Sequence, residues 1–367
     1  MKTYVKIIFF LLFLLYPFNQ IVAEEDINVF YEKARVLSIQ EKTKELETTE
    51  VGGQKGVIVV QDIKIKVLSG ELSGLEKNIE NTLSLNPLDI KLKEGDNILL
   101  YIEQFPDGEY SFQIQSYYVF GTTILLILLF LLTLIIIGGL QGLKAVISLS
   151  VSVVMIFKIL IPMTLKGINP IILSLIISAA IAIITLLLIS GFKKKTLAAI
   201  LGTVGGVALS AIIATIFGNL THLNGLADEH ARILFDQFPN LNYKGLLFAG
   251  IIVGALGAVM DVAMSIASTI AEVKKAQPDI PKGKLIKAGL AVGKDVMGTM
   301  SNTLIFAYVG SSLFLLMLFS NESESYIKFL NFNFVTEEII RSIAGSIGLV
   351  LAIPLTAIIA GYLEDRK

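Results

Sequence analysis

The stretch that decides the fold is GLLFAGIIVGALGAVMDVAMSIASTIAE, residues 245–272. Its apolar length suffices for a membrane-crossing helix, which needs about 20 residues, yet it carries Asp261 in its interior. Read in steps of three and four, its small and polar residues form one stripe: Gly250, Gly254, Gly257, Asp261, Ser265, Ser268 and Glu272. Small residues let another helix approach closely, and a carboxyl at membrane depth needs protein or water beside it instead of lipid. The stretch therefore predicts a membrane helix with one narrow face that is first small and then polar.

The composition also predicts a membrane protein. Hydrophobic residues make up 54% of the 367 residues, and the mean hydropathy is +0.74, well above what a soluble domain tolerates. The net charge of −1 gives no electrostatic basis for binding nucleic acid, so the lipid bilayer is the expected partner and nucleic acid is not. The chain has no cysteine, which excludes disulfides, thiolate catalysis and cysteine metal sites.

Three segments differ in character. Residues 1–23 join lysines to a short apolar run and fit either a cleaved signal peptide or a retained N-terminal anchor helix. Residues 24–116 alternate polar and apolar residues between glycine-containing turns, which predicts an exported all-β domain of about five strands, similar to a small OB-type barrel. Residues 119–363 hold long apolar runs and predict the transmembrane domain.

The fold class that these segments predict is an α-helical integral membrane protein with a small exported β-domain. Lysines and arginines gather in the connections that become cytoplasmic when residues 24–116 are extracytoplasmic. This bias predicts an extracytoplasmic β-domain and a cytoplasmic C-terminus. About seven spans are expected, at residues 119–138, 145–162, 170–190, 196–218, 245–271, 296–319 and 338–362.

Asp261 is the leading candidate for a functional residue. At 1.5 Å per residue it lies about 15 Å from the cytoplasmic end of its helix, near the middle of a hydrocarbon core about 30 Å thick. Burial there disfavours the anion, so the carboxyl is suited to load and release a proton or another ion. Ser265 and, from the following span, Asn302 are its expected hydrogen-bonding neighbours. The alternative is an Asp261 that only locks two helices together.

Small residues at steps of four predict close helix packing. The run 196–218 shows this spacing most regularly, and such a spacing favours a close crossing of two helices. A moving contact in a transporter and a static contact both fit the pattern. The expected packing residues are Gly202, Gly206, Ser210, Gly250, Gly254 and Gly257.

The sequence gives little support to catalysis. No protease, hydrolase or nucleotide-binding motif is present, so we expect no enzyme and no cofactor. His222 and His230 do not have the spacing of a metal site, so no metal is expected. Arg341 follows Glu337 and Glu338 by four and three residues, which predicts a local salt bridge.

Four stretches resemble those of the YibE/F-like bacterial membrane proteins. They are GFKKKTLAAILGT (191–203), the run 245–272, GKDVMGTMSNTLIFAYVGSSL (293–313) and RSIAGSIGLVLAIPLTA (341–357). The resemblance covers nearly the whole chain, including the β-domain, and implies a multi-pass protein of the bacterial cytoplasmic membrane. The family has no assigned activity, so the resemblance implies no site residue.

A second resemblance concerns the last three helices, which are similar to those of half-transporters in the RND and SecD/SecF group. The shared features are a glycine-rich helix with a mid-membrane Asp, a basic loop, and a final small-residue run that contains Pro354. This resemblance implies a proton relay that includes Asp261. The number of spans, the long outer loop before residue 245 and the barrel-like exported domain depart from that pattern.

Two functions follow from these patterns. The first is a proton- or ion-coupled transporter, or a component of an export machine, in which Asp261 titrates with Ser265 and Asn302 beside it. The alternative is a structural or accessory membrane protein that does not transport and that presents its β-domain to a partner in the envelope. In both cases the expected protein partner is a membrane or envelope protein, such as a paralogue.

Overall fold

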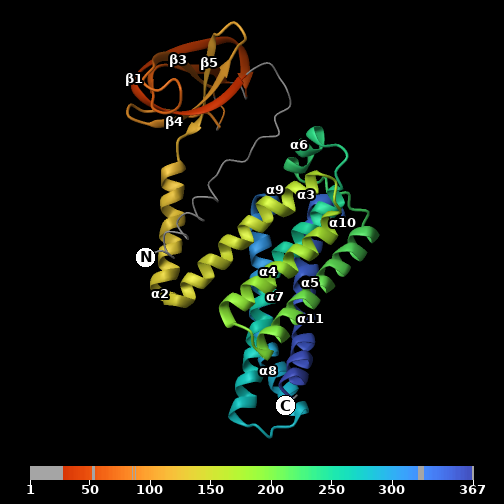
Figure 1. The fold of residues 1–367 in the computed structure, drawn as a ribbon. Coiled ribbons are helices and arrows are strands. Elements are labelled where there is room, and N and C mark those ends of the chain that lie inside the picture. The colour runs from red at the N-terminus through yellow and green to blue at the C-terminus, as the bar shows by residue number, and fades with distance from the viewer. Residues whose placement is uncertain (1–27, 52–53, 85, 87, 321–325, 366–367) are drawn as a thin grey trace. The chain divides into compact units, whose positions relative to one another are not determined.

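A computed structural model of the chain describes residues 28–51, 54–84, 86, 88–320 and 326–365 (Figure 1). The chain divides into two compact units, and the boundary between them falls between Thr133 and Leu134. One unit holds the β-sheet and the first turns of the helix that follows it, and the other is a bundle of helices. The signal peptide or anchor expected at residues 1–23 lies outside the described residues.

The β unit is a half-barrel of five antiparallel strands in the order β3-β2-β1-β4-β5. The predicted five strands are therefore present, but β3 and β5 are the two edges of the sheet, so the curved sheet is not a hydrogen-bonded closed barrel over the described residues (Figure 1). The strands are β1 (Asn28–Val51), β2 (Gln54–Val67), β3 (Glu76–Leu83), β4 (Asn97–Gln104) and β5 (Tyr110–Tyr117).

The core of this unit follows directly from the alternation of its strands. Side chains two residues apart point to the same face of a strand, so one face of the sheet collects the branched apolar residues. Ile63 and Ile65 of β2 and Ile98, Leu100 and Ile102 of β4 are completely buried. Each such side chain contributes about 1.5–3 kcal/mol when it leaves water.

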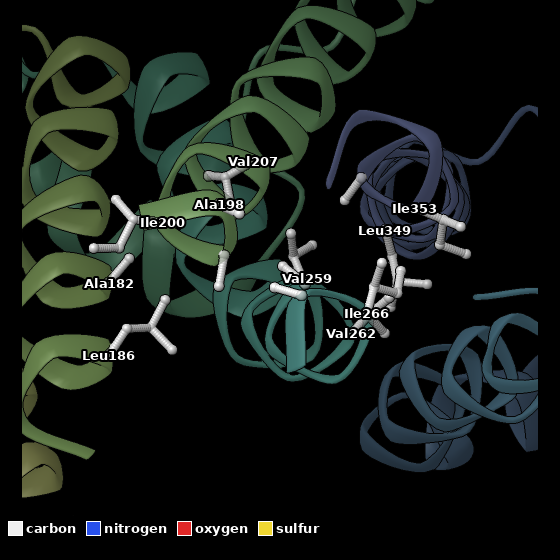
Figure 2. Close-up of a cluster of buried hydrophobic side chains, with 14 of the residues drawn as sticks. Ala182, Leu186, Ala198, Ile200, Val207, Val259, Val262, Ile266, Leu349 and Ile353 are labelled. Carbon is white, nitrogen blue, oxygen red and sulfur yellow. The ribbon is translucent and has the colours of Figure 1, made fainter. Parts of the chain in front are cut away.

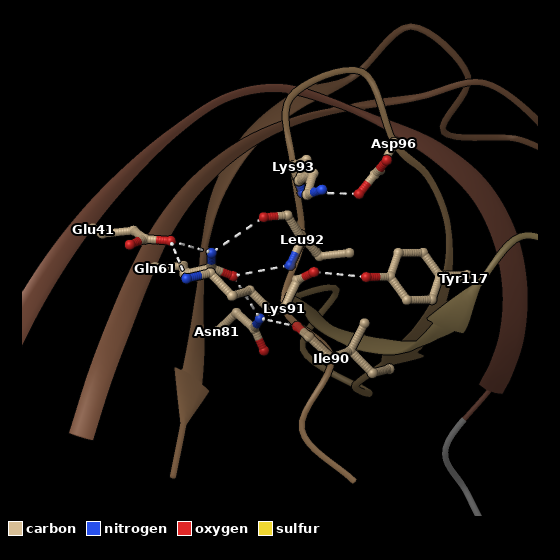
Figure 3. A network of polar contacts seen from close by, with 9 residues as sticks. All are labelled: Glu41, Gln61, Asn81, Ile90, Lys91, Leu92, Lys93, Asp96 and Tyr117. Atoms are coloured by element: carbon tan, nitrogen blue, oxygen red, sulfur yellow. Dashed lines mark hydrogen bonds and ion pairs between the residues drawn. The ribbon is translucent and has the colours of Figure 1, made fainter. Parts of the chain in front are cut away.

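A buried glutamine ties the long connection between β3 and β4 to the sheet (Figure 3). Gln61 is completely buried, and its Nε2 donates to Glu41 Oε1 at 2.9 Å and to the Leu92 carbonyl at 3.2 Å. Its Oε1 accepts from the Leu92 backbone N–H at 3.3 Å and from Asn81 Nδ2 at 3.1 Å. All the hydrogen-bonding capacity of the amide is thus used, and this makes its burial tolerable.

Replacement of Gln61 by Leu should loosen this connection. The substitution leaves the buried N–H and C=O of Leu92 without partners, which costs about 1–3 kcal/mol. Hydrogen exchange on the full-length protein should show faster exchange at the Leu92 amide. Gln40→Leu, at an exposed position of β1, is the matched control, and equal exchange in the two variants would contradict the role of Gln61.

Helices make up the rest of the described chain. Five segments are long and apolar enough to cross a membrane: Phe120–Leu165, Pro170–Ser190, Lys194–Leu220, Tyr243–Ala276 and Asn333–Asp365. Their number and hydropathy indicate a membrane protein. The elements are α2 (Phe120–Met155), η1 (Ile156–Leu160), α3 (Ile161–Leu165), α4 (Pro170–Ser190), α5 (Lys194–Leu220), α6 (Glu229–Gln237), α7 (Tyr243–Ala276), α8 (Lys282–Ser311), α9 (Leu313–Ser320), α10 (Tyr326–Leu330) and α11 (Asn333–Asp365).

Two local breaks explain why these five segments differ from the seven expected spans. At Gly139 the backbone of α2 takes φ 55° and ψ −128°, which only glycine adopts readily, so two helices adjoin within one continuous segment. The expected spans 119–138 and 145–162 correspond to the two arms of this break. The expected span 296–319 is interrupted at Ser312, where α8 ends, and the chain resumes as α9. The apolar part of α8 is therefore short.

The core of the bundle is organised around α7, which packs against α4, α5, α8 and α11. Its buried face carries branched aliphatic residues, among them Ile252, Val259 and Ile266, which are completely buried. Figure 2 shows labelled side chains from α4, α5, α7 and α11 that meet in this core. Asn242 caps the start of α7 by accepting a hydrogen bond from the Gly245 N–H at 2.8 Å.

Close packing between α5 and α11 depends on small residues in both helices. A Cβ added at Gly206 would stand 2.6 Å from Ala352 Cβ, 2.8 Å from Val259 Cγ1 and 3.1 Å from the Gly348 carbonyl oxygen. Gly202 lies in the same way against the side chain of Thr356, and Ser210 lies against Gly348. Three helices therefore converge at Gly206.

Gly206→Ala should destabilise the bundle, because the added methyl must displace atoms of α7 and α11 at once. Overpacking of this kind costs about 1–3 kcal/mol. The control is Gly298→Ala in α8, where an added Cβ meets nothing within 4 Å and where alanine favours the helix by about 1 kcal/mol. Thermal unfolding in detergent should show a lower midpoint for Gly206→Ala only. Equal midpoints for the two variants would refute the convergence at Gly206.

Candidate functional site

The stripe of small and polar residues on α7 lies on its open face. Gly250, Gly254, Gly257, Asp261 and Ser265 are all exposed, whereas the opposite face of the same helix is buried. We call these five residues the α7 face. Within the described part of the chain, no helix backbone lies against these three glycines as that of α11 does at Gly206. An added Cβ at Gly257 would meet nothing within 4 Å, so there is free space next to Asp261, one turn further along.

The structure does not join the three residues that were expected to form a relay. Asp261, Ser265 and Asn302 are each exposed, and no hydrogen bond links them within the described part of the chain. Asp261 and Ser265 share the α7 face, one turn apart, while Asn302 belongs to the exposed side of α8. The carboxyl of Asp261 has no protein partner among the described residues.

A polar cluster covers one end of the α7 face, and the sequence predicted only its salt bridge. The hydroxyl oxygen of Tyr308, from α8, lies 2.5 Å from the position of a Cβ on Gly254. Arg341 Nη1, from α11, lies 3.9 Å from the position of a Cβ on Gly250. The missing side chain of Gly254 leaves the room that the Tyr308 hydroxyl occupies, whereas a Cβ at Gly250 would be in ordinary contact with Arg341.

This cluster contains more carboxylates than cations. Arg341 Nε lies 3.3 Å from Glu338 Oε1, and their side chains are 30% and 21% exposed. The expected salt bridge is thus present with Glu338. Glu337 is 4% exposed, and the backbone N–H groups of Gly225 and Ala227 hydrogen-bond to it. We call Tyr308, Glu337, Glu338 and Arg341 the α8/α11 cluster.

Several buried atoms of the cluster lack a hydrogen-bond partner within the described residues. They are Tyr308 Oη, Glu337 Oε1 and Glu338 Oε2, whereas Arg341 Nε faces Glu338 Oε1 in the ion pair. A small cavity of about 150 Å³ adjoins Tyr308 and Glu338, and most of the other side chains that line it are apolar.

One signal in the sequence pointed to this cluster. Glu337 and Glu338 precede a single Arg341 within one helical turn, so one carboxylate is left unmatched by the local ion pair. Sequence spacing could not place Tyr308 in this cluster, because the position of its side chain depends on how α8 crosses α7 at Gly254. Over the described residues, no group of three or more His, Asp or Glu side chains is placed to hold a metal ion.

Comparison with known families covers both units of the chain. The model of the YibE/F-like protein family matches residues 126–366, and the model of the YibE/F family N-terminal domain matches residues 29–117. No curated protein and no solved structure matches the chain. The resemblance of the last three helices to RND and SecD/SecF half-transporters receives no support from these comparisons. The resemblance carried by residues 191–203, 245–272, 293–313 and 341–357 is confirmed, and the chain belongs to the YibE/F-like family.

Proposed function

We propose that the protein couples the movement of protons or another small ion to transport or export, with Asp261 as the group that takes up and releases the ion. The observation that carries this proposal is the exposure of Asp261 on α7, the helix at the centre of the bundle. Ser265 lies beside it on the α7 face, and Asn302 of α8 is a secondary contributor. The proposal assigns no catalytic residue and no cofactor.

The physical argument starts from the cost of an exposed carboxylate. Asp261 lies near the middle of α7 (Tyr243–Ala276), one of the segments that is long and apolar enough to cross a membrane. An aspartate that faces lipid at the centre of such a helix costs about 2.5–3.5 kcal/mol. Water or a further protein surface must therefore cover it, and the free space at Gly257 gives water room beside the carboxyl.

The proposal includes a location and an orientation. The protein would lie in the bacterial cytoplasmic membrane with residues 24–116 outside and the C-terminus in the cytoplasm. Lys274 and Lys275 in the last turn of α7 support this orientation, because lysines favour the cytoplasmic end of a membrane helix. Residues 119–363 would form the transmembrane domain.

Asp261→Asn should abolish ion coupling, because the amide cannot lose a proton. Purified protein in liposomes, with an imposed proton gradient and an internal pH dye, measures this directly. We expect proton movement in the wild type and the level of protein-free liposomes in Asp261→Asn. The control is Asp295→Asn. Asp295 is an exposed aspartate on α8, and its replacement should leave proton movement at the wild-type level.

Two results would contradict the coupling role of Asp261. Equal proton movement in the wild type and Asp261→Asn would remove the coupling role from this residue. If Asp261→Asn only lowers the thermal unfolding midpoint in detergent, then the carboxyl acts as a structural contact and not as a carrier.

The second candidate function is a structural or accessory protein that presents the β unit to an envelope partner, such as a paralogue. The observation that favours it is a polar recess of about 420 Å³ on the sheet, lined by Ser38, Gln40, Asp62, Ile63, Lys64, Asn78, Ile79 and Glu80. Next to this recess, Lys64 lowers the pKa of the Glu76 carboxyl through a hydrogen bond and its charge. A cellular phenotype that is lost in Asp62→Lys but kept in Asp261→Asn would favour this function over transport.

A further inference from the structure

We propose that the recess between the loop 224–227, α10 and the start of α11 binds the phosphate group of an anionic lipid, with Arg232 as the residue that holds the phosphate. The recess measures about 710 Å³, which lies in the range of about 300–1,000 Å³ that small-molecule sites occupy. Neither Asp261 nor any residue of the α8/α11 cluster lines it. The inference therefore goes beyond the proposed ion coupling and does not rest on it.

The recess lies at the end of the bundle where α11 begins, together with α6, α9 and α10 (Figure 1). At the other end of α11, Asp365 Oδ1 lies 3.8 Å from Lys274 Nζ, in the last turn of α7. Segments Tyr243–Ala276 and Asn333–Asp365 are long and apolar enough to cross a membrane. The headgroups of a bilayer flank its hydrocarbon core, so in a membrane the starts of these segments would lie at the depth of lipid phosphates.

Arg232 is held in the wall of the recess by the main chain. Its Nε donates to the Leu226 carbonyl at 3.0 Å, and its Nη2 donates to the Ala227 carbonyl at 3.1 Å. Within the described residues Arg232 forms no ion pair, and the neighbouring Asp228 accepts from the His230 N–H at 2.8 Å instead. The two bonds use two of the five N–H groups of the guanidinium. The charge and the remaining N–H groups are available to a phosphate, which guanidinium binds with good geometry.

The loop that positions Arg232 is itself fixed from the core. The backbone N–H groups of Gly225 and Ala227 hydrogen-bond to Glu337, which is 4% exposed in α11. The carbonyls of Leu226 and Ala227 then accept from the guanidinium. The buried carboxylate therefore orders the loop, and the loop orders the arginine. A site that is ordered before the ligand arrives loses less conformational entropy on binding.

The charge of the recess favours an anion. Its titratable groups are Arg232 and Lys328, and no Asp or Glu is among the described residues that line it. Asn224 and Asn333 add amide groups, which can donate hydrogen bonds. A cleft lined by charge of one sign raises the local concentration of ions of the opposite sign.

The apolar part of the recess favours a lipid over a free anion. Leu315, Phe332 and Phe334 line it beside Arg232. Leu315 belongs to α9, which carries no charged residue and whose Phe314 side chain is 91% exposed. Contact between an acyl chain and these side chains removes apolar surface from water, which stabilises the complex. A molecule that joins a phosphate to an acyl chain can therefore satisfy both parts of the recess.

Lipid binding by the full-length protein tests the inference. Phosphatidylglycerol is added to the protein in an uncharged detergent, and native mass spectrometry measures the bound lipid. Arg232→Gln should weaken binding about tenfold or more, because the charge-assisted hydrogen bonds to the phosphate are lost. The control is Lys166→Gln, which removes an exposed lysine between α3 and α4 and should bind as the wild type. Equal affinities of Arg232→Gln and the wild type would overturn the inference.

A second variant separates binding from folding, because Arg232 also holds its loop. Lys328→Gln leaves the bonds to Leu226 and Ala227 in place and should weaken binding in the same direction, since it removes a positive charge from the recess. If Arg232→Gln lowers both binding and the thermal unfolding midpoint while Lys328→Gln binds as the wild type, the loss reflects folding and the inference is wrong.

Diacylglycerol and inorganic phosphate test the two parts of the ligand. Diacylglycerol has the acyl chains without the phosphate, and it should bind about tenfold more weakly than phosphatidylglycerol or worse. Equal binding of the two would mean that the apolar walls alone hold the lipid, and Arg232 would lose its role. Millimolar inorganic phosphate should leave phosphatidylglycerol bound, because it lacks the apolar contact. Complete displacement would assign the recess to free phosphate and overturn the lipid.

Discussion

The absence of a side chain at Gly206 is the constraint on which the helical unit depends. At this point α5 approaches Val259 of α7 and Ala352 of α11 at the same time, and a Cβ would clash with both. Backbones that come so close fix the rotation of α7 about its own axis, because its aliphatic side must fill the space between α4, α5 and α11. The small and polar side of α7 is then turned outward.

Two sets of glycines in this bundle therefore have different physical roles. In α5 they remove bulk so that helices can touch, at Gly206 against Ala352 and Val259 and at Gly202 against Thr356. On α7, Gly254 removes bulk beside the hydroxyl of Tyr308. The same residue type thus stabilises the fold in one helix and makes room for a polar site in the other.

Much of the fold was predictable from periodicity, because burial on one face leaves a repeat in the sequence. The α7 stripe and the alternation in β2 and β4 belong to this class. Three features were not predictable in that way. The break at Gly139 depends on a single backbone conformation, the end of α8 at Ser312 falls within an apolar run, and the outward direction of the α7 stripe depends on which neighbours take the other face. The α8/α11 cluster combines residues from two helices, and sequence spacing gives no information about such a meeting.

The contact between Gly206 and Gly348 is reciprocal. A Cβ on Gly206 would stand 3.1 Å from the carbonyl oxygen of Gly348, and a Cβ on Gly348 would stand 2.7 Å from the carbonyl oxygen of Gly206. Ser210 lies still closer to the position of a Cβ on Gly348, so Gly348 remains crowded after a change at Gly206 alone. In genetic terms these positions are epistatic, because substitutions within one shared contact are not additive. An evolving lineage would then change Gly206, Ser210 and Gly348 together, although they lie in helices that are far apart in the sequence.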